Sequence, residues 1–221
     1  MSKEVFKNVD EYINGLFLKE DEVLLNVATS IEDAGIPSIS VSANQGKFLH
    51  LLAKLVKAKK ILELGTLAGY STIWMARALP PDGQLITLEF DPKHAEVAKN
   101  NIQRANLSSL VDIRIGKALD LLPKIEAAGE APFDMIFIDA DKPPYAEYFQ
   151  WAVRLSRPGT LIVTDNVIRD GKVLDDNNED EMVIGVQRFN KMLAGNKAVD
   201  ATIIQTIGEK EHDGMALAIV K

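Results

Sequence analysis

Cysteine is absent from the 221 residues of this sequence. That absence excludes disulfide bridges, thiolate zinc sites, iron–sulfur ligation and a cysteine nucleophile. The chain also lacks an apolar run long enough to cross a membrane. Its N-terminal stretch, MSKEVFKNVDEY, lacks the apolar segment of a secretory signal. We therefore expect a cytoplasmic protein without a membrane partner.

Positive charge is in deficit, with 25 Lys and Arg against 32 Asp and Glu and a formal net charge of −7. Binding to nucleic acid requires clustered Lys and Arg that neutralise phosphates. The charge balance therefore argues against a nucleic-acid partner, although many soluble enzymes share it. A chain of this length with 47% hydrophobic residues is typical of one globular domain with a sizeable core.

Helical periodicity dominates the first third of the chain, where residues 21–34 and 44–58 carry apolar side chains at the spacing of one helical face. Further along, short apolar runs alternate with helix-length segments. These runs are 60–64, 85–90, 111–115, 135–139 and 160–165. The alternation favours an α/β fold with a doubly wound, mostly parallel sheet. We expect a single domain over 1–221, with a helical cap at 1–58 and a Rossmann-like core at 59–221.

The last two strand-like runs, 201–207 and 215–220, are joined by the polar segment GEKEHDG. This segment is too short for a helical crossover, so the two runs should form an antiparallel hairpin. We expect Asp213 and Gly214 to form its turn and His212 to lie at its solvated tip, with a place at the mouth of the site as the alternative for His212. His50 and His94 show no metal-ligand spacing, and we assign no catalytic role to any of the three histidines.

The first predicted strand ends in ILELGTLAGYS, where Gly65 and Gly69 bracket a turn into a helix. Ligands of open parallel sheets bind beyond the carboxyl ends of the strands. Glycines let a ligand approach the backbone, and a helix N-terminus offers N–H groups to an anion. The G-x-G-x-x-G fingerprint of dinucleotide binding is missing. A lone G-x-x-x-G is weak, and a sterically required strand–helix turn remains an alternative.

The second strand ends in Glu89, whose two carboxylate oxygens could accept both ribose hydroxyls of an adenosine ligand. The alternative role is a helix N-cap. Asp91, directly before Pro92, fills that role better. The pattern therefore predicts that Glu89 is free to bind ribose.

Acidic side chains also end two later strands. Asp139 follows one, and Asp165 with Asn166 follows the next. Two converging carboxylates would repel each other unless a cation lies between them. Carboxylate and amide oxygens suit Mg²⁺, Ca²⁺ or Mn²⁺, although strand-end acids can also cap helices. Lys142 would then lie beside the cation as a general base, unless it is an ordinary surface lysine.

Four segments, ELGTLAGYS, LEFD, FIDADK and VTDN, together resemble the cation-dependent O-methyltransferase family that includes catechol and caffeoyl-coenzyme A O-methyltransferases. The resemblance extends from about residue 41 to 220. It implies a seven-stranded sheet with an antiparallel last strand and extra N-terminal helices. It also implies metal-dependent methyl transfer from S-adenosylmethionine to one hydroxyl of a catechol, flavonoid or hydroxycinnamate. No basic cluster suits a coenzyme A phosphate. Because the family is mostly dimeric, we expect a homodimer.

The resemblance also implies a role for each matching residue. The metal ligands would be Asp139, Asp165 and Asn166. Lys142 would act as the base, with Asp139 beside it in the catalytic group. The remaining set surrounds the cofactor: Val41, Glu63, Gly65, Tyr70, Ser71, Glu89, Ala118 and Asp139. In this set Glu89 would bind the ribose, Ala118 would lie beside the adenine, and Glu63 would support the glycine loop.

Two other functional classes remain open on the sequence. The first is a metal-independent S-adenosylmethionine methyltransferase that acts on another acceptor. The second is an NAD-dependent oxidoreductase, which the missing fingerprint disfavours. A non-catalytic binding module fits least, because so many polar side chains follow strand ends.

Overall fold

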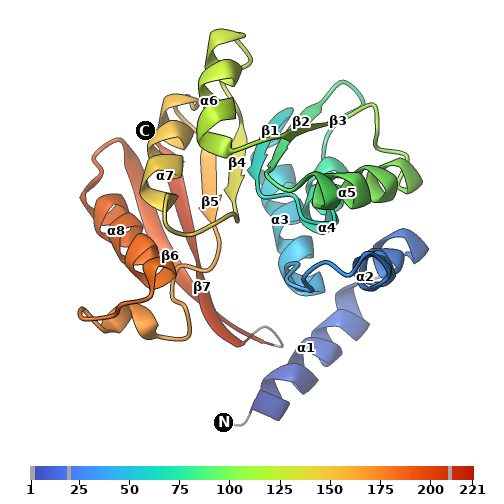
Figure 1. The fold of residues 1–221 in the computed structure, drawn as a ribbon, viewed down its shortest axis with the longest axis horizontal. Coiled ribbons are helices and arrows are strands. Elements are labelled where there is room, and N and C mark those ends of the chain that lie inside the picture. The colour runs from blue at the N-terminus through green and yellow to red at the C-terminus, as the bar shows by residue number, and fades with distance from the viewer. Residues whose placement is uncertain (1–2, 19–20, 209–210) are drawn as a thin grey trace.

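The structure is a computed structural model that describes residues 3–18, 21–208 and 211–221. A seven-stranded sheet runs through it in the order β3-β2-β1-β4-β5-β7-β6 (Figure 1). The strands are β1 Lys60–Leu64, β2 Gln84–Glu89, β3 Val111–Ile115, β4 Met135–Ile138, β5 Leu161–Thr164, β6 Val199–Gly208 and β7 Glu211–Val220. β7 pairs antiparallel with β5 and β6, and the other neighbouring pairs are parallel. The predicted fold class is confirmed.

Helices cover both faces of the sheet, with α3, α4 and α5 on one face and α6, α7 and α8 on the other (Figure 1). Their bounds are α1 Lys3–Phe17, α2 Glu22–Ala34, α3 Ala43–Leu55, α4 Tyr70–Ala76, α5 Pro92–Arg104, α6 Ala118–Ala127, α7 Tyr145–Arg154 and α8 Glu181–Gly195, with a 3₁₀ turn at Lys172–Leu174. None of the described helices is long and apolar enough to cross a membrane.

The central strands are buried on both faces, which explains their continuous apolar sequences. Successive side chains of a strand point to opposite faces. In β1, Ile61 packs with the cluster beneath α3 and α4, whereas Leu62 packs with the cluster beneath α6 and α7. Both side chains are fully buried. The sheet is therefore a rigid platform from which the strand ends project.

The N-terminal helices begin and end where local chemistry favours it. Asp21 caps α2 by accepting from the Leu24 N–H at 3.2 Å, and Gly35 ends that helix in the left-handed conformation. Ser42 and Gln45 form a reciprocal capping box at the start of α3. The segment 36–42 between these two helices has no regular secondary structure.

The predicted hairpin exists, but its strands are longer than expected. β6 extends to Gly208 and β7 begins at Glu211, so the ladder takes in most of GEKEHDG. Asp213 and Gly214 lie within β7, paired with residues of β6, and the expectation that they form the turn is wrong. Cross-strand pairing continued past the point where composition suggested a loop. Residues 209–210 lie outside the described part of the chain.

The order in which the chain adds strands to the sheet reverses between the neighbouring strands β1 and β4. β1 is followed by β2 on one side, whereas β4 is followed by β5 on the other. Asp139 continues the β4–β1 pairing by donating its N–H to the Leu64 carbonyl at 2.9 Å. The loops that follow β1 and β4 therefore diverge, which opens a crevice at the carboxyl ends of these strands.

Candidate active site

Two cavities adjoin in this crevice. We call the first, of about 910 Å³, the strand-end cavity, because the segments after β1, β2 and β4 line it. The second, of about 650 Å³, is the hairpin cavity, bounded by β6 and β7. Both volumes lie in the range of small-molecule sites. Residues shared by the two linings are Ile39, Ser40, Val41, Asp139, Asn166 and Arg169.

Gly65 sets the floor of the strand-end cavity. Its φ is +94°, and a Cβ on this residue would overlap the carbonyl oxygen of Asp139. Only glycine allows this backbone conformation together with such a close approach. The turn leads directly into α4, where Tyr70 and Ser71 line the cavity. The glycine at this turn is therefore required for steric reasons, and the turn also leaves its surface open to a ligand.

Glu63 lies beneath that turn and outside the linings of both cavities. It is fully buried and accepts hydrogen bonds from the hydroxyls of Ser71 at 2.6 Å and Thr72 at 2.5 Å. Burial raises the pKa of this carboxyl to about 7, and the hydroxyl donors only partly offset that effect. Glu63 therefore anchors the first turn of α4, which agrees with a supporting role.

Glu89 lines the strand-end cavity, but it is not free of other contacts as predicted. Its Oε2 accepts the backbone N–H groups of Thr66 at 3.0 Å and Leu67 at 2.8 Å, and its Oε1 accepts the N–H of Asp91 at 3.0 Å. The β1 loop folds over the end of β2, which sequence spacing does not reveal. Asp91 caps α5 as predicted. These three hydrogen bonds hold the Glu89 carboxylate in one orientation.

The remaining predicted cofactor residues contribute shape. Val41 precedes α3 and lines both cavities, whereas Ala118 is the first residue of α6 and lines the strand-end cavity. His94 also lines that cavity, with its Nδ1 at 3.5 Å from Glu89 Oε1. The sequence analysis missed His94, although its place on the first turn of the helix after Glu89 was a usable signal.

Asp139 and Asp165 meet as predicted. Ile138 and Thr164 are register partners in β4 and β5, so the two carboxylates that follow them lie at the same edge of the sheet. Asp165 is 2% exposed. Burial, with the charge of Asp139 as a further cause, raises the pKa of Asp165 to about 7. A buried carboxylate beside a partly buried one is an arrangement that could hold a cation.

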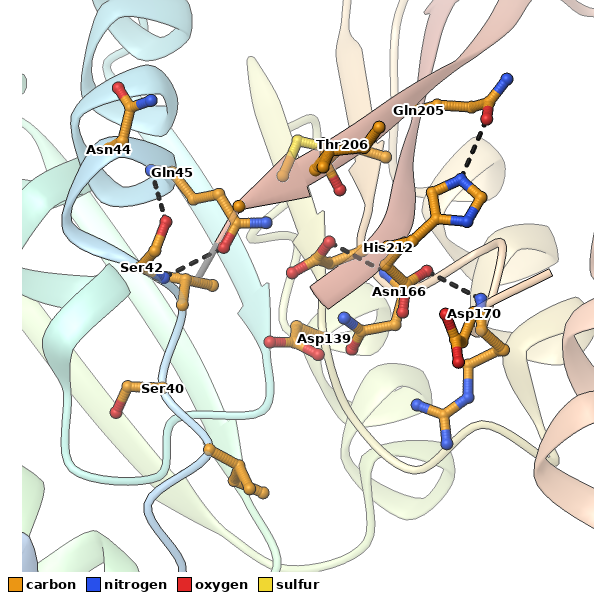
Figure 2. A pocket seen from close by; sticks show the side chains of 18 of the residues that line it. Ser40, Ser42, Asn44, Gln45, Asp139, Asn166, Asp170, Gln205, Thr206 and His212 are labelled. Atoms are coloured by element: carbon orange, nitrogen blue, oxygen red, sulfur yellow. Dashed lines mark hydrogen bonds between the residues drawn. The ribbon is translucent and has the colours of Figure 1, made fainter. Parts of the chain in front are cut away.

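Asn166 adds a neutral oxygen donor beside Asp139 (Figure 2), in the cavity that Asp165 also lines. Its φ of +57° is a left-handed conformation that few side chains adopt, and such outliers gather at functional sites. Across residues 3–18, 21–208 and 211–221, no three carboxylate, imidazole or thiolate side chains gather as a metal site. The donor set is therefore two carboxylates and one amide oxygen, which suits a hard cation that keeps several water ligands.

Lys142 is buried at 5% exposure, which excludes the surface alternative. Its Nζ donates to Asp139 Oδ1 at 2.9 Å and to the Tyr145 hydroxyl at 2.6 Å. The neighbouring Asp141 accepts from the Tyr148 hydroxyl at 2.6 Å instead of capping a helix. An amine held in one orientation beside two carboxylates can accept or donate a proton at a fixed point.

Tyr145 is a site residue that the sequence analysis missed. The side chain is fully buried, and its hydroxyl donates to the Asp165 carbonyl at 3.1 Å while accepting from Lys142. It thereby links the segments after β4 and β5. Its place three residues after Lys142 was the available signal, because such spacing brings side chains together at a helix start.

Both strands of the hairpin contribute to the wall of the second cavity. His212 lines this cavity, and its Nε2 lies 2.9 Å from Gln205 Oε1 (Figure 2). Asp213 Oδ1 accepts the backbone N–H groups of Ile168 and Arg169, both at 2.9 Å. The hairpin therefore fixes the loop that follows Asn166, a long-range contact that sequence position does not indicate.

Comparison with known proteins agrees with this architecture. The O-methyltransferase family model matches residues 17–220. The chain is 67% identical over 221 residues to a catechol O-methyltransferase of Niastella koreensis, with 100% of each chain covered. It is also similar to the structure of TomG, an O-methyltransferase of Streptomyces achromogenes, in complex with SAM (50% identity, TM-score 0.97, 100% and 99% coverage).

A further solved structure, the Bacillus cereus O-methyltransferase in complex with SAH, has 47% identity and a TM-score of 0.98, with 100% of each chain covered. The family resemblance of the four strand-end segments is thus confirmed over nearly the whole chain. This chain belongs to the O-methyltransferase family.

Proposed function

We propose that this O-methyltransferase moves the methyl group of S-adenosylmethionine to one hydroxyl of an aromatic ring that carries two vicinal hydroxyls. A divalent cation, Mg²⁺ or alternatively Mn²⁺ or Ca²⁺, would be held by Asp139, Asp165 and Asn166. The observation that carries the proposal is the convergence of the buried Asp165 and the partly buried Asp139 beside the buried Lys142. The catechol O-methyltransferase name of the Niastella koreensis relative supports the same acceptor class.

S-adenosylmethionine would occupy the strand-end cavity. The TomG and Bacillus cereus structures contain SAM and SAH, respectively, which supports this choice. Glu89 would accept the ribose hydroxyls, and the turn at Gly65 with Tyr70 and Ser71 would face the methionine end. Val41, Ala118 and Asp139 would complete the walls. All these residues line the cavity, whereas Glu63 would act from below by holding the first turn of α4.

The chemistry needs an ionised hydroxyl, because the sulfonium already activates the methyl group. A free phenol has a pKa of about 10, so roughly one molecule in a thousand is ionised at pH 7. A cation held by Asp139, Asp165 and Asn166 would supply electrostatic stabilisation of the ionised hydroxyl. Asp139 and Asp165 provide the charges that retain it. Both are needed, because one carboxylate and an amide would leave the cation weakly bound.

Lys142 would receive the hydroxyl proton at Nζ. Asp139 and Tyr145 hold that nitrogen in place, so the transfer occurs at a fixed point. The walls of the two cavities would align the acceptor oxygen with the methyl group, and such positioning can supply much of the rate acceleration. Lys142 would thus remove the proton, and the proposed metal ligands Asp139, Asp165 and Asn166 would help to align the acceptor.

Two measurements test the proposal against its alternatives. S-adenosylhomocysteine should raise the unfolding temperature, whereas NAD should leave it unchanged. With Mg²⁺ present, catechol should be methylated and phenol should not, because phenol has one hydroxyl. Stabilisation by NAD alone would support the oxidoreductase instead. Equal rates with catechol and phenol would support a metal-independent methyltransferase.

A homodimer is the assembly we propose. α1 carries exposed apolar side chains that recur along the helix: Val5, Val9, Tyr12, Leu16 and Phe17. A second copy would remove part of this apolar surface from water. Light scattering should then give twice the chain mass of 24.3 kDa, and a single-chain mass at micromolar concentration would contradict the proposal.

A further inference from the structure

Arg169 lies in the wall that the strand-end cavity and the hairpin cavity share. Its Nε is buried and has no hydrogen-bond partner. Most other arginines pair with a carboxylate: Arg77 with Asp21, Arg114 with Asp112 and Glu130, Arg154 with Glu126, Arg157 with Asp134, and Arg188 with Glu147. In the described ranges, Arg169 and the exposed Arg104 form no such pair.

The backbone that carries Arg169 is held from several sides. Its N–H donates to Asp213 Oδ1, and the next N–H, that of Asp170, donates to the His212 carbonyl at 2.9 Å. Arg169 and Asp170 both have left-handed φ angles, +54° and +56°. Two such residues in succession are uncommon outside glycine and cluster at functional sites. The guanidinium is therefore presented to the cavities by a fixed turn, three residues after Asn166.

An unpaired, partly buried guanidinium is a recognition group for a planar anion. It presents its donors in a fork that matches a carboxylate, and it stays charged at any pH of interest. No carboxylate among the described residues pairs with it, which leaves the guanidinium available to a ligand. Resting on the proposed function, we propose that Arg169 binds a carboxylate carried by the acceptor, and that the preferred substrates are catechols with an acidic side group.

Two features favour the acceptor as the source of this carboxylate. Arg169 belongs to the segment that follows β5 and the proposed metal ligands, whereas the methionine end of the cofactor would face the β1 turn and α4. Arg169 also reaches the hairpin cavity, which the β1 turn and α4 do not line. A ring bound at Asp139 and Asn166 would thus share a cavity wall with Arg169, which follows Asn166 by three residues.

Acidic residues in the hairpin cavity suggest a competing ligand, a catechol that carries an ammonium group. Asp213 is poorly suited to bind it, because its Oδ1 already accepts backbone N–H groups from Ile168, Arg169 and Gly214. Asp170 is exposed and therefore well hydrated. The shared wall also contains Asp139, but the proposed function assigns that carboxylate to the cation, and Arg169 is then the charged group left there for an anionic acceptor.

The test compares protocatechuate, a catechol with a ring carboxylate, with its neutral methyl ester and with dopamine. Arg169→Gln should lower the ratio of kcat/KM for protocatechuate to that for the ester by about 10- to 100-fold, mostly through KM. Arg169→Lys should recover part of the loss, since it keeps the charge but not the fork. The matched control, Arg104→Gln, should leave the ratio unchanged.

Calorimetry provides a readout that does not need turnover. With Mg²⁺ and S-adenosylhomocysteine present, protocatechuate should bind the wild-type protein about 10-fold or more tightly than it binds Arg169→Gln. An unchanged ratio, an equal rise of the KM for S-adenosylmethionine with both acceptors, or a preference for dopamine would overturn the inference. Absence of activity with every catechol, with protocatechuate binding still dependent on Arg169, would contradict the proposed function and leave only the carboxylate-binding role of Arg169.

Discussion

Asp165→Ala should abolish methyl transfer, lowering kcat/KM for catechol by about a thousandfold or more, while S-adenosylhomocysteine still binds. The wild-type carboxylate lies at the end of β5, 2% exposed, beside Asp139. Without it, one carboxylate and one amide would have to retain a divalent cation, and the stabilisation of the ionised hydroxyl would be lost with the cation. Asp165 does not line the strand-end cavity, so the cofactor should bind normally.

Three measurements check this expectation. Calorimetry should show the loss of Mg²⁺ binding, a fluorescence titration should show unchanged affinity for S-adenosylhomocysteine, and rates should no longer respond to Mg²⁺. The unfolding temperature without metal should not fall, because the substitution removes a buried carboxyl that Asp139 repels. Asp176→Ala, a change in an exposed carboxylate, is the control. Full Mg²⁺-stimulated activity in Asp165→Ala would contradict the assigned role.

The wild-type protein should also bind Mg²⁺ more tightly as the pH rises. Because the pKa of Asp165 is raised to about 7 in the absence of metal, the carboxyl is mostly protonated below that pH, and the cation must displace the proton. Affinity should therefore rise by up to about tenfold per pH unit below 7 and level off above it. Calorimetry between pH 5.5 and about 8.5 measures this, and a flat profile would contradict it.

Lys142→Met should lower kcat by about a hundred- to ten-thousandfold, the range in which a positioned base contributes. Met keeps most of the length and apolar volume of the side chain but cannot accept a proton. The amine contacts Asp139 and Tyr145 but is not one of the proposed metal ligands. Mg²⁺ binding should therefore persist, in contrast to Asp165→Ala.

The comparison of kcat with KM separates a base from a structural residue. Lys142→Met should leave the KM for S-adenosylmethionine within about threefold of wild type, and single-turnover kinetics should place the defect in the chemical step. Tyr145→Phe, which removes one partner of Nζ, should lose about tenfold in kcat. Lys124→Met, on the exposed side of α6, is the control. A kcat near the wild-type value in Lys142→Met would remove Lys142 from the proton transfer.

Much of the fold could be predicted because its signals are local. Burial on both faces makes the central strands continuously apolar, so β1 and β3 were predicted with their observed bounds. Gly65 and Asp139 follow strands directly, and the carboxyl ends of parallel strands share one edge. The fold class alone was therefore enough to predict that Gly65 and Asp139 lie at the same edge of the sheet.

The features that were missed depend on contacts between distant segments. Glu89 was expected to be free, but the loop after β1 folds over it and supplies two of its hydrogen bonds. Asp213 was assigned to a turn from its Asp-Gly composition, whereas the β6–β7 ladder extends through it. No local pattern records that its carboxylate would anchor the backbone of Arg169, because the two residues meet only in the folded chain.

The central claim is that a divalent cation held after β4 and β5 is required for methyl transfer to a catechol. The most direct measurement is the rate of that transfer with S-adenosylmethionine, first in excess EDTA and then after Mg²⁺ is restored in excess over the chelator. We predict background activity in EDTA and full recovery with Mg²⁺, while S-adenosylhomocysteine binds equally well in both conditions. Full activity in EDTA would contradict the account.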